Sequence, residues 1–419
     1  MAEASFTTMG LCAPILRALT EHNYTSPTPI QLEGIPAVLT KKDVMAAAQT
    51  GTGKTAAFTL PILHLLYEAQ LKQPKHVTNN HVRTLILAPT RELASQIYDN
   101  VVKYSQYMDV RVNVVFGGVK INPQMMKIRR GTDILIATPG RLLDLVQKNA
   151  VKFGQLNTLV LDEADRMLDM GFIHDIKRVI TLLPQKRQTL MFSATFSDDI
   201  RQLAKRLVKQ PIEITVTPPN STVERIEQVL YTVNQSDKTK LLIHLIKEYN
   251  FHHVLVFSRT KHGANRLTTT LIKKGIPAAA IHGNKSQNVR TRALNDFKNN
   301  DIQVLVATDI AARGIDVAGL PYVINFDLPD VSEDYVHRIG RTGRAGESGL
   351  AISLVTPEQA PALAGIEHLI QLHIPRKNES GFVCSQAIPQ TNLQKKAKKP
   401  KKPKKPKPPQ SAPSQARRR

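Results

Sequence analysis

The sequence has few cysteines, few aromatic residues and no long apolar run. Its only cysteines, Cys12 and Cys384, lie near opposite ends of the chain, and neither belongs to a CxxC or Cys/His cluster. We therefore expect reduced thiols and neither a disulfide framework nor a zinc site. The most apolar stretch, residues 55–67, is interrupted by Pro61 and His64 and is too short to span a membrane. Because the start, MAEASFTTMG, also has no basic n-region, we expect a cytoplasmic protein with no membrane segment.

Acidic residues are scarce relative to basic ones. The chain has 57 Lys and Arg against 34 Asp and Glu, a net charge of +23, and residues 392–419 hold nine Lys, three Arg and no acid. This stretch is rich in proline and has no apolar residues to build a core, so we expect a disordered tail. It reads as a nucleic-acid tether or, alternatively, as a solubilising tail. An excess of positive charge favours a polyanion as partner.

Short apolar runs alternate with amphipathic segments along most of the chain, and no short fixed period repeats. This alternation predicts parallel sheets covered by helices on both faces, in two successive domains of about 150 to 200 residues. A Pro-Pro-Asn-Ser-Thr break at 218–222 marks the boundary between them. We expect domains at 1–217 and 225–376, a linker at 218–224 and the tail at 377–419. The runs expected as strands are 43–48, 84–89, 111–117, 133–138, 158–163, 189–195, 253–258, 278–283, 303–309, 322–327 and 349–355.

Two carboxylates follow one of these strands directly. The apolar run LNTLVL ends in Asp162 and Glu163, which places acid groups at the carboxyl edge of a sheet, where open α/β folds bind ligands. Such carboxylates commonly hold Mg²⁺ on a nucleotide.

A glycine-rich segment provides a cradle for the phosphates of that nucleotide. The stretch AQTGTGKT at 48–55 stands between an expected strand and an expected helix. In such a loop, backbone N–H groups approach phosphates, Lys54 neutralises charge and the Thr55 hydroxyl can bind Mg²⁺ together with Asp162. Ala48 replaces the first glycine of the usual pattern, so a glycine turn followed by a chance Lys-Thr is the alternative for this segment alone. Its pairing with the carboxylates removes that alternative.

Together these motifs resemble those of the DEAD-box RNA helicases, over residues 6–375. The resemblance implies two tandem RecA-like domains, each a mainly parallel sheet with helices on both faces, and ATP-dependent, local and non-processive separation of RNA strands. The wording of HGNKSQNVRTRALNDFK and the basic tail are most similar to the bacterial RhlE-type branch. The motifs, in the order of the family, are YTSPTPIQ (24–31), AQTGTGKT, PTRELA (89–94), Gly117-Gly118, TPGR (138–141), DEAD (162–165), SAT (193–195), LVFSRT (255–260), HGNKSQNVR (282–290), ATDIAARGID (307–316) and HRIGRTGR (337–344).

For ATP binding, the amide of Gln31 can pair with an adenine edge. The resemblance assigns this selection of ATP to Gln31, with help from Phe6 and Tyr24, although Asn23 stands where the family usually has glycine. Taken alone, PTPIQ would read as a proline-rich turn at the start of a helix. The other ATP-binding residues implied by the family are Ala48, Gln49, Thr50, Gly51, Thr52, Gly53, Lys54, Thr55 and Asp316.

For hydrolysis, the resemblance makes Asp162 the Mg²⁺ ligand and Glu163 the residue that orients or deprotonates the attacking water. Arg341 and Arg344 are expected as arginine fingers, with contact to RNA backbone as the alternative. Lys54 completes the catalytic set. The residues expected to couple the two domains are Asp165, Ser193, Thr195 and His337, and Asp165 could also act as a helix N-cap.

RNA contacts are expected mainly with the sugar-phosphate backbone, because Arg, Thr and Gln hydrogen-bond phosphates and 2′-hydroxyls while Gly exposes backbone N–H groups. A DNA helicase and an ATP-gated RNA clamp or annealing protein remain as alternatives. Ribosomal or RNA-degradation complexes are the expected partners through the branch resemblance. The expected RNA-binding residues are Thr90, Arg91, Gly118, Thr138, Arg141, Arg259, Gly283, Gln287, Arg290, Thr308 and Gly314.

Overall fold

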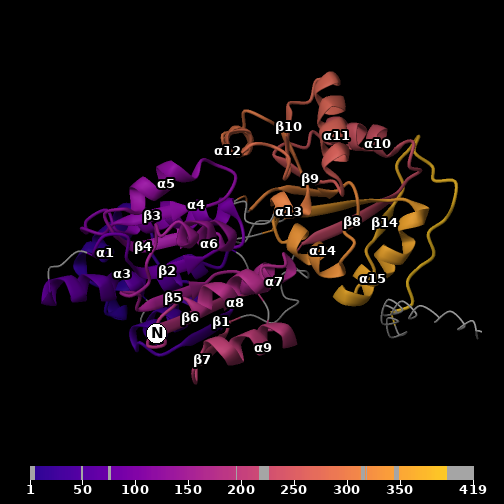
Figure 1. Cartoon of the computed structure of the whole chain (residues 1–419). Helices are drawn as coiled ribbons and strands as arrows, with labels where there is room; N and C mark the ends of the chain where they lie inside the picture. The colour runs from indigo at the N-terminus through magenta and orange to yellow at the C-terminus, as the bar shows by residue number, and fades with distance from the viewer. Residues whose placement is uncertain are drawn as a thin grey trace, which may run out of the picture.

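Two parallel sheets with the same strand order form the framework of the protein. The computed structural model describes residues 5–48, 51–73, 77–194, 196–216, 226–312, 317, 319–343 and 349–393. Within these residues the sheet orders are β3-β4-β2-β5-β6-β1-β7 and β10-β11-β9-β12-β13-β8-β14, and the second order is the first with seven added to each number. The two sheets lie in separate lobes (Figure 1). The expectation of two α/β domains with parallel sheets is confirmed.

The first domain places its helices on both faces of its sheet. Its strands are β1 Val44–Ala47, β2 Val82–Leu87, β3 Val112–Val115, β4 Thr132–Ala137, β5 Thr158–Leu161, β6 Gln188–Ser193 and β7 Ile212–Thr215. Its helices are a 3-10 turn at Phe6–Met9, α1 Ala13–Glu21, α2 Pro29–Leu39, α3 Lys54–Lys72, α4 Arg91–Tyr104, α5 Ile121–Ile128, α6 Pro139–Gln147, α7 Ala164–Asp169, α8 Ile173–Thr181 and α9 Asp198–Leu207.

Burial explains why the strands of this sheet read as continuous apolar runs. Every residue of β1, β4, β5 and β6 is buried, as expected for a parallel sheet covered on both sides. One core lies under α1–α4 and includes Phe58, whose ring packs 5.0 Å from that of Phe192. A second core lies on the other face under α6–α9. The apolar residues of the strands therefore alternate between two cores.

The second domain repeats this plan with fewer helices before its last strand. Its strands are β8 Glu227–Thr232, β9 Val254–Phe257, β10 Ala278–Ile281, β11 Val304–Ala307, β12 Tyr322–Asn325, β13 Leu350–Val355 and β14 Arg376–Lys377. Its helices are α10 Lys238–Glu248, α11 Lys261–Lys273, α12 Gln287–Lys298, α13 Asp309–Ala312, α14 Ser332–Ile339, a 3-10 turn at Pro357–Gln359 and α15 Ala360–Ile370.

All eleven runs expected as strands contain a strand, but three further strands were not predicted. β7 is half exposed at the edge of its sheet, so it has no continuous apolar run. β8 and β14 pair with each other at one side of the second sheet, and β14 has only two residues. These strands form by pairing with adjacent strands, and the local sequence pattern does not show which strands will be adjacent.

The C-terminal boundary predicted at residue 376 is wrong. Strand β14 includes Lys377, and the segment after it packs on the second domain, where Ile388 is buried and Glu379 lies 3.1 Å from His244. Its apolar residues are too widely spaced to show a periodic pattern, and they become buried only against an existing domain. The tail from 394 to 419 and the linker predicted at 218–224 lie outside the described residues.

Candidate nucleotide and nucleic-acid site

The glycine loop stands between β1 and α3, as the sequence predicted. Gly51 and Gly53 have φ angles of 81° and 93°, a backbone region that residues with a Cβ rarely adopt. Helix α3 begins at Lys54, whose buried Nζ donates to the carbonyl of Ala48 at 2.7 Å. Thr55 follows within the first turn. The loop thus offers a helix N-terminus and a cation to a bound anion, while Gln49 and Thr50 lie outside the described residues.

Gln31 lies directly against this loop. Its Nε2 donates to the carbonyl of Gly53 at 3.2 Å, and its Oε1 accepts the N–H of Thr28 at 2.9 Å. A Cβ added at Gly53 would lie 2.3 Å from Gln31 Nε2, so only glycine permits this approach. Gln31, the residue expected to recognise adenine, is therefore held between the start of α2 and the glycine loop.

The two aromatic residues expected near the nucleotide differ in exposure. Phe6 is 4% exposed and belongs to the core of the first domain. Tyr24 is partly exposed, and its ring meets Tyr104 edge-on at 5.6 Å, with the two hydroxyls 3.0 Å apart. Phe6 thus supports this region from within the core, and Tyr24 offers the more accessible ring.

Asp162 ends β5 in a nearly dry environment. It is 2% exposed, and its Oδ1 accepts the N–H of Glu163 at 2.9 Å. Burial raises the pKa of Asp162 well above its usual range, and nearby Lys54 opposes that rise. A buried carboxylate with this little compensation gains stability from a bound cation.

Glu163 has an unusual backbone conformation. Its φ and ψ are both 52°, in the left-handed region, at the turn between β5 and α7. Such strain is found at functional sites because the surrounding structure must enforce it. The carboxylate is 2.6 Å from the guanidinium of Arg166, and both side chains are buried. The sequence did not single out Arg166.

Asp165 joins the DEAD segment to the SAT segment through Ala194. One of its oxygens accepts the N–H of Ala194 at 2.9 Å, and the other accepts the N–H of Arg166. Ser193 ends β6 and is fully buried, and its hydroxyl has no hydrogen-bond partner among the described residues. Thr195 lies outside the described residues.

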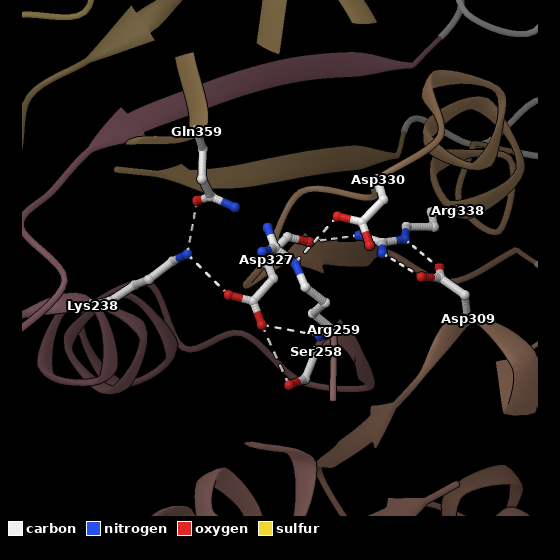
Figure 2. Close-up of polar contacts among 8 residues, drawn as sticks. All are labelled: Lys238, Ser258, Arg259, Asp309, Asp327, Asp330, Arg338 and Gln359. Carbon is white, nitrogen blue, oxygen red and sulfur yellow. Dashed lines mark hydrogen bonds and ion pairs between the residues drawn. The ribbon is translucent and has the colours of Figure 1, made fainter. Parts of the chain in front are cut away.

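Motif residues of the second domain form a network around Asp327 (Figure 2). The carboxylate of Asp327 accepts the N–H of Arg259 at 3.0 Å and lies 3.2 Å from the buried Nζ of Lys238. Its backbone carbonyl accepts Arg338 Nη1 at 2.6 Å. Arg338 also binds Asp309 through two bonds of 2.6 and 2.7 Å. One hub therefore connects the loop of Arg259, an expected RNA contact, to helix α14.

The expected arginine finger Arg341 lies two residues after the end of α14, near the first domain. It is 7% exposed and lines a narrow cavity together with Arg166 of the first domain. His337 lines the same cavity, 3.9 Å from Asp334. Arg341 thus lines one cavity with the residue that follows the DEAD segment, whereas Arg344 and Asp316 lie outside the described residues.

On the first domain, the expected RNA-binding residues lie at the carboxyl edge of the sheet. Thr90 caps α4 through a bond from the N–H of Leu93, and Thr138 precedes α6. A Cβ at Gly118 would lie 2.1 Å from the guanidinium of Arg91, so this side chain rests on the glycine. Arg141 Nη1 is buried and has no hydrogen-bond partner among the described residues, which leaves a donor for an anion.

Two residues expected to bind RNA also contact the first domain. Gln287 Nε2 and Arg290 Nη2, both on α12, each lie 2.9 Å from the carboxylate of Glu92 on α4. Gln287 also accepts a bond from Arg91 at 3.3 Å. Glu92 was not predicted, although it lies inside PTRELA. One feature of the sequence could have indicated Glu92: it is an acidic residue in a motif that is otherwise expected to bind an anionic ligand.

The remaining second-domain positions follow its strands. Thr308 comes directly after β11 and is buried, and Gly283 comes after β10 near Lys261. Arg259 is partly exposed and lies 3.6 Å from Asp330. Gly314 lies outside the described residues. Within the described part of the chain, no cluster of three or more His, Cys, Asp or Glu residues forms a metal centre, and no helix is both long and apolar enough to cross a bilayer.

Family models match most of the two domains. Residues 28–203 match the DEAD/DEAH box helicase model, and residues 237–346 match the helicase conserved C-terminal domain model. Together they include the glycine loop, the DEAD segment and Arg341.

Similar curated proteins are bacterial RNA helicases. The chain is 40% identical over 385 residues to the DEAD-box ATP-dependent RNA helicase RhpA of Helicobacter pylori, covering 90% of this chain and 76% of the relative. It is also 40% identical over 372 residues to CshA of Geobacillus kaustophilus, covering 89% and 78%.

Similar solved structures include complexes with RNA. Saccharomyces cerevisiae Dbp5 bound to RNA and ADP-BeF₃ has a TM-score of 0.79 at 30% identity, covering 89% of this chain and 95% of that one. Mss116 bound to single-stranded RNA and UDP-BeF has a TM-score of 0.79 at 29% identity, covering 90% and 79%. A DEAD-box protein from Methanococcus jannaschii has a TM-score of 0.51 at 36% identity, covering 89% and 99%.

Proposed function

We propose a mechanism on the premise that the chain belongs to the DEAD-box family of ATP-dependent RNA helicases, RNA-stimulated ATPases built from two RecA-like domains. The observation that carries the proposal is the placement of Arg341 and Arg166 around one interdomain cavity beside Glu163. ATP binds between the domains, and hydrolysis requires the second domain to bring its finger to the phosphates held by the first.

The described structure corresponds in this proposal to the closed, RNA-binding arrangement. The bridge from Glu92 to Gln287 and Arg290 joins the domains directly. The chain also superposes better on two RNA-bound proteins near 30% identity than on the M. jannaschii protein at 36% identity. The protein with the higher sequence identity has the lower TM-score. A different arrangement of the two domains is the simplest cause of this difference.

Magnesium fits the donor set of the first domain. The carboxylate of Asp162 and the hydroxyl of Thr55 are hard oxygen ligands, and substrate phosphates would complete the shell. Burial raises the pKa of Asp162 although Lys54 opposes that rise, so a bound cation would stabilise its charged form. When bound, Mg²⁺ neutralises charge on the β- and γ-phosphates.

The positions of the side chains support the proposed catalytic roles. Glu163 orients or deprotonates the attacking water, because its carboxylate adjoins Asp162 without being needed as the metal ligand. Lys54 and Arg341 neutralise the transferring phosphoryl from opposite domains. Arg344, outside the described residues, is proposed as the second finger. Gln31, Tyr24 and Asp316 hold the nucleoside.

RNA binds along the carboxyl edges of both sheets, mainly through its backbone. The unpartnered Nη1 of Arg141 and the loop of Arg259 supply donors, and Gly118 leaves room beside Arg91. Closure would bend one strand and expel its duplex partner, so strand separation is local. An ATP-gated clamp is the second candidate, favoured by the cross-domain bridge at Glu92, which holds the closed state independently of hydrolysis.

Steady-state ATP hydrolysis by the purified protein tests this function. The measurement compares the protein alone, with single-stranded RNA and with DNA of matching length. We expect strong stimulation by RNA and little by DNA. Equal stimulation by DNA would point to a DNA helicase, whereas stimulation by RNA without loss of an RNA duplex in a strand-displacement assay would favour the clamp.

The basic tail is proposed as an RNA tether. Deleting residues 392–419 removes 12 positive charges and should weaken RNA binding, because each phosphate contact on a single strand contributes about −0.7 to the salt slope. We expect a shallower slope of log affinity against log salt, with kcat at saturating RNA unchanged. Binding by fluorescence anisotropy at several salt concentrations measures it, and an unchanged slope would contradict the tether.

Cellular context follows from the substrates and the resemblance. We propose that the protein acts in the cytoplasm, and the RhlE-type resemblance of residues 282–298 supports a role on ribosomal RNA or within RNA-degradation complexes. If the protein acts as a clamp, we expect it to anneal RNA strands in the same setting.

A further inference from the structure

Arg166 is the one charged residue of helix α7 that contacts the expected catalytic base. Its Nη1 lies 2.6 Å from Glu163 Oε2, and the two side chains are only 5% and 8% exposed. A bond this short between opposite charges is a strong, oriented hydrogen bond. It differs from an ordinary surface pair three residues apart on a helix, because water does not compete for either group.

The pair also compensates a concentration of negative charge. Asp162 and Asp165 flank Glu163 in sequence, and all three carboxylates belong to one turn. Without Arg166, the carboxylate of Glu163 would be buried beside two acids with no partner on its own helix, and it would turn towards any other donor. The strained backbone of Glu163 fixes the direction in which its side chain leaves the chain, and the contact with Arg166 fixes the position of its carboxylate.

Arg166 also lies beside residues of helix α14 of the second domain. It lines the narrow interdomain cavity with Asp309, Asp334 and Arg341. Arg338 already neutralises Asp309, and Asp334 lies 3.9 Å from His337. Arg166 is therefore buried at a point where the two domains meet.

We propose that Arg166 is a positioning residue for ATP hydrolysis, which holds the Glu163 carboxylate in one orientation while the domains are closed. Opening of the cleft admits water to Arg166 and loosens the pair. RNA binding, which closes the cleft, thereby also aligns the base. This inference rests on the proposed role of Glu163, and it adds a second way, besides the arrival of Arg341, in which closure activates hydrolysis.

A double-mutant cycle tests the proposal. The four proteins are wild type, Arg166→Gln, Glu163→Gln and the double variant, compared by steady-state phosphate release at saturating RNA. We expect Arg166→Gln to lower kcat about tenfold or more, because small misplacement of a catalytic group has effects of this size. KM for ATP should be unchanged. In the Glu163→Gln background, Arg166→Gln should cause no further loss, because its target is already absent.

Two further variants separate positioning from folding. Arg166→Lys keeps the charge and should retain most of the rate that Arg166→Gln loses. If Arg166→Gln does not fold, Arg166→Ala is the test variant and should show the same loss of kcat. Arg178→Gln, at an exposed position on α8, is the matched control and should behave as wild type. RNA binding in the presence of a non-hydrolysable ATP analogue should be the same for all variants if closure is intact.

Two results would overturn the proposal. One is wild-type kcat in Arg166→Gln; the other is a loss that multiplies with that of Glu163→Gln, which would mean that Arg166 acts on something else. If Glu163→Gln itself hydrolyses ATP at the wild-type rate, the proposed base fails instead. The single variants therefore tell the two failures apart.

Discussion

Glu163→Gln is expected to lower the RNA-stimulated kcat by about 10³-fold, within the range for loss of a general base. The amide is nearly isosteric with the carboxylate but cannot accept a proton from water. ATP and RNA should still bind, because Glu163 is assigned to neither. The variant should therefore accumulate as a closed complex with ATP and RNA, detected by slow RNA dissociation and by phosphate release.

The control for this experiment is Glu248→Gln, an exposed glutamate at the end of α10. It should hydrolyse ATP as the wild type does. Rapid phosphate release by Glu163→Gln would exclude its role as the base. Loss of RNA binding would show instead that the substitution had disturbed the DEAD turn, whose backbone is strained at this residue.

Arg341→Gln is expected to lower kcat by about 10³-fold or more, the size of effect found for arginine fingers. Arg341 comes from the second domain and lines the interdomain cavity with Arg166, so its charge reaches the phosphates only in the closed state. Hydrolysis measured with saturating RNA checks this. KM for ATP should change much less than kcat, since the finger acts on the transition state.

Arg266→Gln on the exposed face of α11 provides the matched control for the loss of one positive charge in the same domain. If Arg341 contacted RNA backbone, as the sequence also allowed, the variant would lose RNA affinity and steepness of salt dependence, while kcat at saturating RNA would recover. The two assignments therefore predict opposite behaviour at high RNA concentration.

Local patterns were sufficient for most of the fold. The buried strands of parallel sheets are apolar along their whole length, so all eleven runs identified in the sequence contain strands. Edge strand β7 and the short β14 were missed because they alternate or are brief and depend on neighbours for their pairing. The packing of residues 377–393 was missed because Ile388 becomes buried only against a formed domain.

The candidate site shows the same division. Glycines with positive φ, the lysine at the start of α3 and carboxylates at the end of β5 are local features, and the structure places them as the sequence predicted. Glu92 could not be recognised, because its partners Gln287 and Arg290 stand on another domain. Arg166 could not be recognised from the sequence either, because an arginine near a carboxylate is common on helix surfaces.

The sequence by itself determined the type of fold, the phosphate loop and the acid groups that face it, because each depends on residues adjacent in the chain. Only the tertiary structure decided which charges meet. Gln287 and Arg290, expected as RNA contacts, also form a bridge with Glu92, and Arg166 contacts both Glu163 and a cavity lined by the second domain. Electrostatic interactions depend on distance and burial, and for residues on different domains neither is encoded in local spacing.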